Sequence, residues 1–300
     1  MSTLYIIGNG FDLHHLLKTK YSDFHSFVEE HYNDLGWAFE EFFALSFDEN
    51  YLWSDFEHDL RTFNWKSFFN HYNSIDVMSD SFKLSERFGL EDEISEAGET
   101  LIQHIRDAFG EWIDELEYPE LTVDNAKLLK LDTPCKVLNF NYTASLELYY
   151  GISQNDILYI HNKADGHGSD LIFGHGTNKE SDPKTDEQDE NGDSNRTIFT
   201  DAEDAARTIF YEFKKDTKSI LRIHREFFTG LSNIDQIIVL GHSLGDVDWP
   251  YFRYLRKCLP SAEWQISYYG SFEENTKRNL AHKVLNLDYE KIKMIRLEDL

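Results

Sequence analysis

Two glycines and an acidic residue directly follow the first apolar run of the chain, in the stretch Gly8-Asn9-Gly10-Phe11-Asp12. Glycines let the backbone turn sharply and approach a ligand closely, and amides at the start of a following helix can hold a phosphate. The stretch therefore predicts a nucleotide-binding turn, although leucine replaces the third glycine of the G-x-G-x-x-G fingerprint. The alternative is a tight strand-to-helix turn in which Asp12 is the helix N-cap.

Asn141 follows a second apolar run, within the stretch Asn139-Phe140-Asn141-Tyr142-Thr143. Ligands of open α/β sheets gather at the carboxyl ends of the strands. A carboxamide at such an end both donates and accepts hydrogen bonds, which suits a ribose or a nicotinamide. An asparagine that caps the next helix is the alternative.

Two histidines occur in a similar context. His161 follows Tyr159-Ile160, and His175 stands between Gly174 and Gly176. A histidine at a strand end can act as a general base because its ordinary pKa is close to neutrality. A structural histidine is the alternative at either position. His167 lies between the two, and we expect it to be less firmly fixed.

Ser243 is the centre of a G-x-S-x-G pattern, Gly241-His242-Ser243-Leu244-Gly245, after the strongest apolar run. In an α/β-hydrolase this pattern is the nucleophile elbow. Its triad needs an acid and a histidine further along the chain, and only His282 follows. The other interpretation is a nucleotide-binding turn, in which Ser243 contacts a ribose or phosphate and Asp246 lies beside the ligand.

Short apolar runs are typical of buried parallel strands, and helical patterns separate most of them. They predict an α/β, Rossmann-like fold with a largely parallel sheet flanked by helices. The predicted strands are residues 3–7, 136–140, 157–160, 171–173, 236–240, 265–269 and 293–297.

Helical periodicity fills most of the chain between the first two strands, which is far more than a crossover between parallel strands requires. We therefore expect one Rossmann-like domain over residues 1–300, with a large helical subdomain inserted at 14–130. It would cover a cleft or form an oligomer interface. Residues 178–198 are polar and acidic and predict a flexible loop. Residues 200–228 then predict one long helix.

The composition excludes several classes of function. The 300 residues carry 29 Lys and Arg against 55 Asp and Glu, a net charge of -26, which disfavours binding to nucleic acid or to anionic membranes. Cys135 and Cys258 are the only cysteines, so the chain has no disulfide framework and no paired cysteine ligands for zinc. The N-terminus lacks a signal-peptide pattern and no apolar run is long enough to span a bilayer. We expect a cytoplasmic protein.

Taken together, the motifs resemble the AbiH family of bacterial phage abortive-infection proteins. They occur in order and span nearly the whole chain. The matching stretches are Tyr5-Ile6-Ile7-Gly8-Asn9-Gly10-Phe11-Asp12-Leu13, Trp53-Ser54-Asp55-Phe56-Glu57, Phe140-Asn141-Tyr142-Thr143, Ile160-His161, Phe173-Gly174-His175-Gly176, and Gly241-His242-Ser243-Leu244 with Asp248, Tyr251 and Phe252.

The same series is similar, more distantly, to the sirtuin-like NAD-consuming proteins of phage defence. That resemblance implies that Asn141 and His161 act at the nicotinamide ribose of NAD. Thr143 stands where that family has an aspartate, and Asn162 where a glycine follows the histidine, so His175 remains a substitute for His161. The implied ligands of the ADP-ribose part are Gly8, Asn9, Gly10, Phe11, Asp12 and Ser243, with Asp246 in the same turn as Ser243.

The sequence therefore predicts a phage-defence protein that binds NAD or a related nucleotide and hydrolyses its nicotinamide–ribose bond. No cofactor or metal is required, because NAD is the substrate and the zinc cysteines of sirtuin deacetylases are missing. A serine hydrolase using Ser243 and a non-catalytic nucleotide sensor are the alternatives, and a metal-dependent nuclease is a weaker one. The expected partners are a small nucleotide, a phage trigger and a further copy of the chain.

Overall fold

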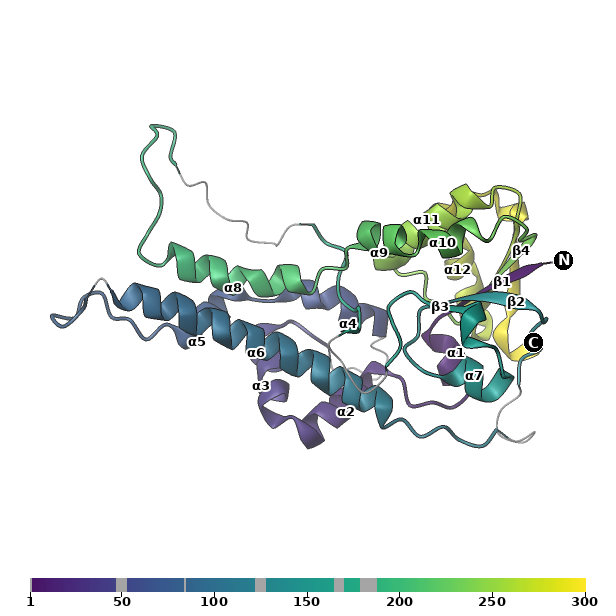
Figure 1. Ribbon diagram of the computed structural model, residues 1–300, viewed down its shortest axis with the longest axis horizontal. Coiled ribbons are helices and arrows are strands. Elements are labelled where there is room, and N and C mark those ends of the chain that lie inside the picture. Colours follow the sequence, from purple (N-terminus) through teal and green to yellow (C-terminus); the bar gives the residue numbers. More distant parts are fainter. Residues whose placement is uncertain (1, 47–52, 84, 122–127, 165–169, 179–187) are drawn as a thin grey trace. The chain divides into compact units, whose positions relative to one another are not determined.

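The computed structural model describes residues 2–46, 53–83, 85–121, 128–164, 170–178 and 188–300. They form two compact units (Figure 1). The sheet unit consists of Met1–Asp23, Gly110–Ile172 and Asp216–Leu300, and the helical unit of Phe24–Phe109 and Phe173–Lys215. The predicted helical insertion at 14–130 therefore supplies only part of the helical unit, since a second, later segment joins it.

The sheet unit is built on six parallel strands in the order β3-β2-β1-β4-β5-β6. This is a Rossmann order, because the chain extends the sheet on one side of β1 and then returns to the other side. The predicted α/β, Rossmann-like fold is confirmed. The strands are β1 (Thr3–Ile7), β2 (Cys135–Asn139), β3 (Ile157–Tyr159), β4 (Gln236–Leu240), β5 (Glu263–Tyr268) and β6 (Ile292–Arg296).

The strands are apolar because both faces of the sheet are covered. Alternate residues of β1 enter different cores, with Leu4 and Ile6 on one face and Tyr5 and Ile7 on the other. Helices α9, α10, α11 and α12 cover the first face, and α1 and α7 cover the second. Their bounds are α1 (Asn9–His14), α7 (Ser145–Tyr150), α9 (Thr217–Ile223), α10 (Arg225–Thr229), α11 (Trp249–Cys258) and α12 (Gly270–Leu285).

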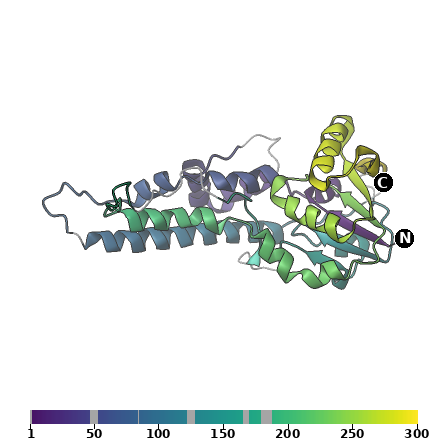
Figure 2. The ribbon, with the colours of Figure 1, turned by 90° about the horizontal axis from the view of Figure 1, so that it is seen from above.

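The helical unit is held by aromatic packing. Phe24 contacts Phe39, Phe56 and Phe109 edge to face, and the guanidinium of Arg207 lies 3.8 Å from the ring centroid of Trp65. Figures 1 and 2 show α8 running alongside α6. The helices are α2 (Tyr21–His31), α3 (Asn33–Phe42), α4 (Trp53–Asp59), α5 (Trp65–Tyr72), α6 (Glu86–Asp114) and α8 (Thr200–Glu212), of which α2 and α6 extend into the sheet unit.

Two predicted elements are wrong. Residues 171–173 are not a strand of the sheet, and the Ile172 amide donates to the carbonyl oxygen of His161 at 3.0 Å. The single helix expected over 200–228 is three helices, α8, α9 and α10. The helix stops after α8 because the backbone of Phe213 and Lys215 pairs with that of His175, at 2.9 Å in both hydrogen bonds.

Much of the predicted acidic loop at 178–198 lies outside the described residues. In its described part, Gln188 and Ser194 form an isolated bridge. Within the described part of the chain, no helix is long and apolar enough to cross a bilayer.

Candidate active site in the sheet unit

The glycines after β1 and β4 bring two loops into backbone contact. The Gly8 amide donates to Leu240 O at 3.0 Å, and the Gly10 amide donates to Gly241 O at 2.7 Å. A Cβ on Gly8 would lie 2.6 Å from His242 Cα, and one on Gly241 would lie 2.1 Å from Phe11 N. This junction lies where the strand order reverses, the usual ligand position in such sheets. Because the Gly10 amide donates to Gly241 O, it holds the two loops together and is not directed at a ligand.

Asp12 is not a helix N-cap. Gly8 occupies the N-cap of α1, and Asp12 lies within the helix. Its buried carboxylate accepts hydrogen bonds from Thr143 Oγ1 at 2.7 Å and from Ser145 Oγ at 2.6 Å. Burial raises the pKa of Asp12 from its usual 3.8 to about 6, against the opposing effect of those hydroxyls and of Asn141. Through these hydrogen bonds, Asp12 of α1 contacts the segment that follows β2.

Two other residues of this turn, Asn9 and Phe11, also have partners within the protein. Asn9 donates from Nδ2 to Thr19 O at 2.7 Å. Phe11 is fully buried and packs against His15, with 4.4 Å between the ring centroids. His15 in turn bonds Phe11 O and Tyr150 Oη, and burial lowers its pKa to about 4. These contacts fix the turn.

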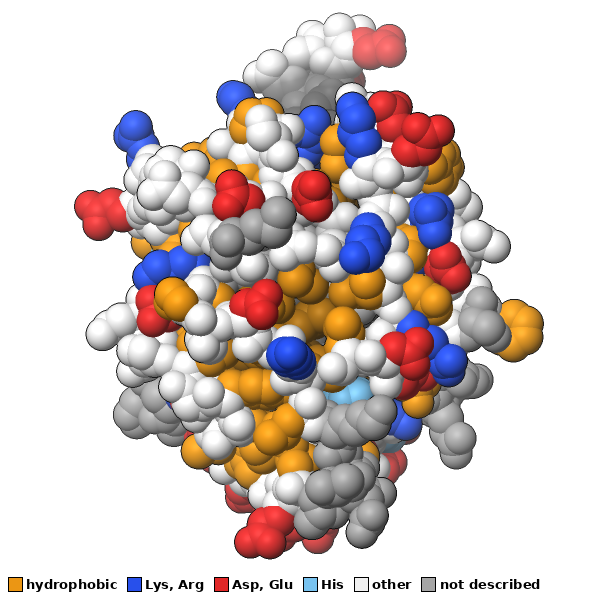
Figure 3. All heavy atoms as spheres, turned by 90° about the vertical axis from the view of Figure 1, so that its right-hand side faces the viewer, with side chains coloured by type: hydrophobic (Ala, Val, Ile, Leu, Met, Phe, Trp, Pro, Cys, Tyr) orange, Lys and Arg blue, Asp and Glu red, His pale blue; other side chains and the backbone are white. Residues whose placement is uncertain are grey.

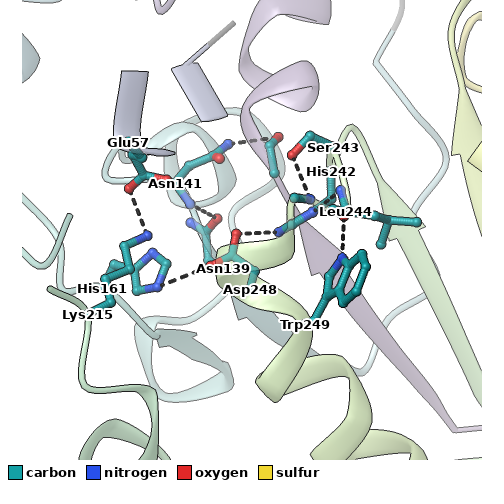
Figure 4. A network of polar contacts seen from close by, with 12 residues as sticks. Glu57, Asn139, Asn141, His161, Lys215, His242, Ser243, Leu244, Asp248 and Trp249 are labelled. Carbon is teal, nitrogen blue, oxygen red and sulfur yellow. Dashed lines mark hydrogen bonds and ion pairs between the residues drawn. The ribbon is translucent and has the colours of Figure 1, made fainter. Parts of the chain in front are cut away.

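Asn141 joins the end of β2 to the end of β1. Its Nδ2 donates to Gly8 O at 3.1 Å, and its amide donates to Asn139 Oδ1 at 3.0 Å (Figure 4). Helix α7 has Ala144 at its N-cap and no side-chain cap, so capping does not explain this asparagine. Asn141 is buried beside the glycine junction, and its Oδ1 is an acceptor at the carboxyl edge of the sheet.

Two histidines flank one carboxylate at the carboxyl ends of β3 and β4. His161 Nε2 lies 3.8 Å from Asp248 Oδ1, and His242 Nε2 lies 3.5 Å from Asp248 Oδ2 (Figure 4). All three side chains are largely buried. Phe140 contacts both imidazoles edge to face, at centroid distances of 5.4 Å and 4.5 Å. A carboxylate between two imidazoles within an aromatic wall is suited to holding and passing a proton.

Sequence reasoning missed two members of this cluster. His242 and Asp248 belong to the same motif as Ser243. Their positions shortly after the end of β4 are the signal by which the sequence could have shown them. Phe140, which covers both imidazoles, follows β2, and His161 follows β3. No local sequence pattern reveals that these residues meet His242 and Asp248. Among the described residues, no group of three or more histidine, cysteine, aspartate or glutamate side chains could hold a metal ion.

His175 belongs to the helical unit, whereas His161 belongs to the sheet unit. The Thr177 amide donates to His175 Nδ1 at 3.2 Å, so Nε2 carries the proton and donates to Phe210 O at 2.9 Å. Burial lowers the pKa of His175 to about 4. With both ring nitrogens bonded to the backbone, His175 is built as a neutral structural side chain. His167 lies outside the described residues.

Ser243 lacks the geometry of a nucleophile elbow in the described structure. Its Oγ accepts the Gly245 amide at 3.2 Å, and the positive φ angles fall on Gly241 and Leu244. His282 bonds Leu287 O through Nδ1 at 2.6 Å. The serine is half-buried and Asp246 is exposed, so both can meet a ligand from solvent.

The helical unit contains a buried ion pair. Lys215 Nζ lies 2.7 Å from Glu57 Oε1, and their side chains are 0% and 8% exposed (Figure 4). The pair connects α4 to the segment after α8. Removing one partner of such a pair is costly because the other charge is left buried.

Comparison with known proteins identifies the family. The family model described as bacteriophage abortive infection AbiH matches residues 4–268. No curated protein and no solved structure gives a significant match. The matched region begins within β1 and contains the glycine junction and all three members of the histidine–aspartate cluster. Since the match extends over most of its length, the chain belongs to the AbiH family of bacteriophage abortive-infection proteins.

Proposed function

We propose that this AbiH-family protein acts in phage defence by binding NAD, or a closely related nucleotide, and hydrolysing the bond between nicotinamide and ribose. The observation that carries the proposal is the pairing of His161 with Asp248 at the carboxyl edge of a Rossmann-ordered sheet. Asn141 and the glycine junction lie at the same edge, since they follow β2, β1 and β4. That edge is where such sheets bind nucleotides.

The chemistry requires an oriented ribose and a base for water. Cleavage of the C1′–N1 bond passes through an oxocarbenium-like state, so holding the sugar in place supplies much of the rate. Asn141 would orient the ribose hydroxyls or the attacking water through its carboxamide. His161 would accept the proton of that water. Ser243, Asp246 and the turn from Gly8 to Asp12 would hold the ADP-ribose part.

The test is to incubate the purified protein with NAD, with and without a chelator, and to quantify nicotinamide. We expect release that survives chelation and falls by about 100-fold or more in Asn141→Ala and His161→Ala. Asn155→Ala and His104→Ala are matched controls, because both side chains are exposed. Circular dichroism and thermal unfolding check that the variants fold.

A parallel measurement covers an enzyme that needs its trigger. Cells that carry the wild-type chain or His161→Ala are infected with phage, and their NAD content is followed. Loss of NAD with the wild type alone supports the proposal. Unchanged NAD in both, together with tight NAD binding by the pure protein, would favour a nucleotide sensor. Labelling of Ser243 by a phosphonate probe would instead favour a serine hydrolase.

A further inference from the structure

We propose that His242, Asp248 and His161 form a relay, in which a neutral His242 orients Asp248, and Asp248 orients His161 and stabilises its protonated form. The catalytic use of the relay rests on the proposed NAD hydrolysis. The relay itself is a property of the sheet unit alone. His161 is the catalytic residue in this scheme, and His242 and Asp248 are positioning residues.

The backbone fixes the protonation state of His242. The Leu244 amide donates to His242 Nδ1 at 2.9 Å, so this nitrogen carries a lone pair and the proton is on Nε2. The turn that makes this bond is held firmly, because Leu244 has a φ of 60° and its carbonyl accepts from Trp249 Nε1 at 2.8 Å. His242 is therefore held as the neutral Nε2–H tautomer.

In that tautomer, the Nε2–H group of His242 is directed at Asp248. His242 Nε2 lies 3.5 Å from Asp248 Oδ2, and hydrogen bonds of catalytic groups are commonly long before substrate binds. Asp248 Oδ1 faces His161 Nε2 at 3.8 Å. A buried carboxylate is costly without a charged or donating partner. Because His242 is held neutral, the imidazole of this cluster that can become the cation is His161.

Aromatic rings around the two imidazoles favour the protonation of His161 beside Asp248. Phe140 packs against both imidazoles, and Tyr251 and Tyr142 also contact the His161 ring. These rings reduce access of water to the carboxylate, and charge interactions are stronger in a medium of low polarity. The arrangement follows the logic of a catalytic triad, in which a buried carboxylate fixes the tautomer of a histidine and stabilises its imidazolium.

The proposed step balances as follows. The C1′–N1 bond of NAD breaks and its electron pair leaves with neutral nicotinamide. The oxygen of water forms a bond to C1′, and one water proton moves to His161. With the Nε2 proton of His161 directed at Asp248, the accepting atom is Nδ1. The imidazolium then returns its extra proton to solvent, so that NAD and water give nicotinamide, ADP-ribose and a proton.

The first test measures tautomers in the ligand-free protein by NMR of ¹⁵N-labelled histidine. We expect His242 in the Nε2–H form, with Nδ1 unprotonated, and His161 in the Nε2–H form. In Asp248→Asn we expect His161 to lose this preference while His242 keeps its tautomer. A wild-type His242 protonated at Nδ1 would overturn the proposal.

The second test separates the donor of His242 from its role in the turn. Glutamine places an amide nitrogen where Nε2 lies, and asparagine places an amide oxygen where Nδ1 lies. We expect His242→Gln to keep kcat within about threefold, and His242→Asn and Asp248→Asn to lower kcat by about 100-fold with little change in KM. Asp288→Asn is the control, since its carboxylate is exposed and lies 3.5 Å from Lys291 Nζ.

The opposite ranking of the two His242 variants would overturn the proposal, because it would assign His242 to the turn alone. Failure of the relay and failure of the proposed function are distinguishable. If the wild type releases no nicotinamide, the tautomer measurement still decides the relay. If nicotinamide is released but the tautomers differ from those expected, the NAD hydrolase stands without the relay.

Discussion

At the scale of single residues, three buried polar side chains beside the glycine junction have specific partners. Asp12 accepts from two hydroxyls, Asn141 donates to a backbone carbonyl, and His15 uses both ring nitrogens. Such pairing offsets the cost of removing polar groups from water. Because burial shifts the pKa values of Asp12 and His15, their protonation is coupled to the stability of the fold.

The first prediction concerns Asp12, whose raised pKa favours the protonated form in the folded state. Its stabilising contribution is complete below pH 3.8 and is lost as the pH rises through about 6. We therefore expect the unfolding free energy of the wild type, relative to Asp12→Asn, to fall by about 2 kcal/mol between pH 4 and pH 7. Urea unfolding at several pH values measures it.

The comparison removes other titrations in that range. His15 and His175 have pKa values lowered to about 4, so they destabilise the fold as the pH falls, in wild type and variant alike. Asp156→Asn is the control, because its carboxylate lies on the surface beside Lys136. A difference between wild type and Asp12→Asn that does not vary with pH would contradict the prediction.

At the scale of elements, the junction of the β1 and β4 loops depends on close backbone approach. The two strands are neighbours in the sheet, so the loops that follow them must share one small space. Gly241 combines a φ of 65° with a position that faces Phe11 N, and both features favour glycine. The junction therefore sets where the His242 side chain begins, and through it the cluster with Asp248.

The second prediction uses two glycines with the same backbone angle. Gly270 also has a φ of 65°, but a Cβ there would meet nothing within 4 Å. We expect Gly270→Ala to cost about 1 kcal/mol, the penalty of the angle alone. Gly241→Ala adds a clash with the β1 loop and should cost several times more, or prevent folding. Equal losses of unfolding free energy in the two variants would show that the junction is not tightly packed.

The chain after α8 shows where long-range contacts override a local pattern. Residues 200–228 have helical periodicity throughout, yet the helix is broken by backbone hydrogen bonds to His175. Asp216 then starts α9 by accepting the amide of Ser219 at 3.1 Å. The capping residue is visible in the sequence, whereas the pairing partner lies about forty positions away and is not.

At the scale of the whole molecule, the chain carries a large excess of negative charge. The net charge is -26, and Figure 3 shows Lys and Arg side chains interspersed with Asp and Glu on one face of the protein. Like charges repel within a folded chain and destabilise it, and salt screens this repulsion. Exposed ion pairs such as Lys136–Asp156 contribute little in comparison.

The third prediction follows from that balance. Raising NaCl from about 20 mM to about 300 mM shortens the screening length to a few ångströms and should raise the melting temperature at pH 7 by several degrees. Differential scanning calorimetry measures it. Sucrose at equal osmolality is the control for excluded-volume effects. A melting temperature that falls with salt would contradict the prediction, because it would mean that attractive surface pairs, such as Lys136–Asp156, outweigh the general repulsion.

The sequence by itself determined the elements that depend on local pattern. Strand β4 occupies the predicted residues 236–240, and the glycine turns after β1 and β4 are where their residue types indicated. The order of the motifs was sufficient to identify the AbiH family. Periodicity and turn chemistry act over a few residues, which is why these features can be read without a structure.

Only the tertiary structure decided which side chains meet. It separates His161 and His175 into different units, gives Asp12 two hydroxyl partners instead of a cap, and brings His161 to Asp248 and His242. The physical reason is that these contacts join residues tens to hundreds of positions apart. Strand order, and not local pattern, determines which strand ends become neighbours.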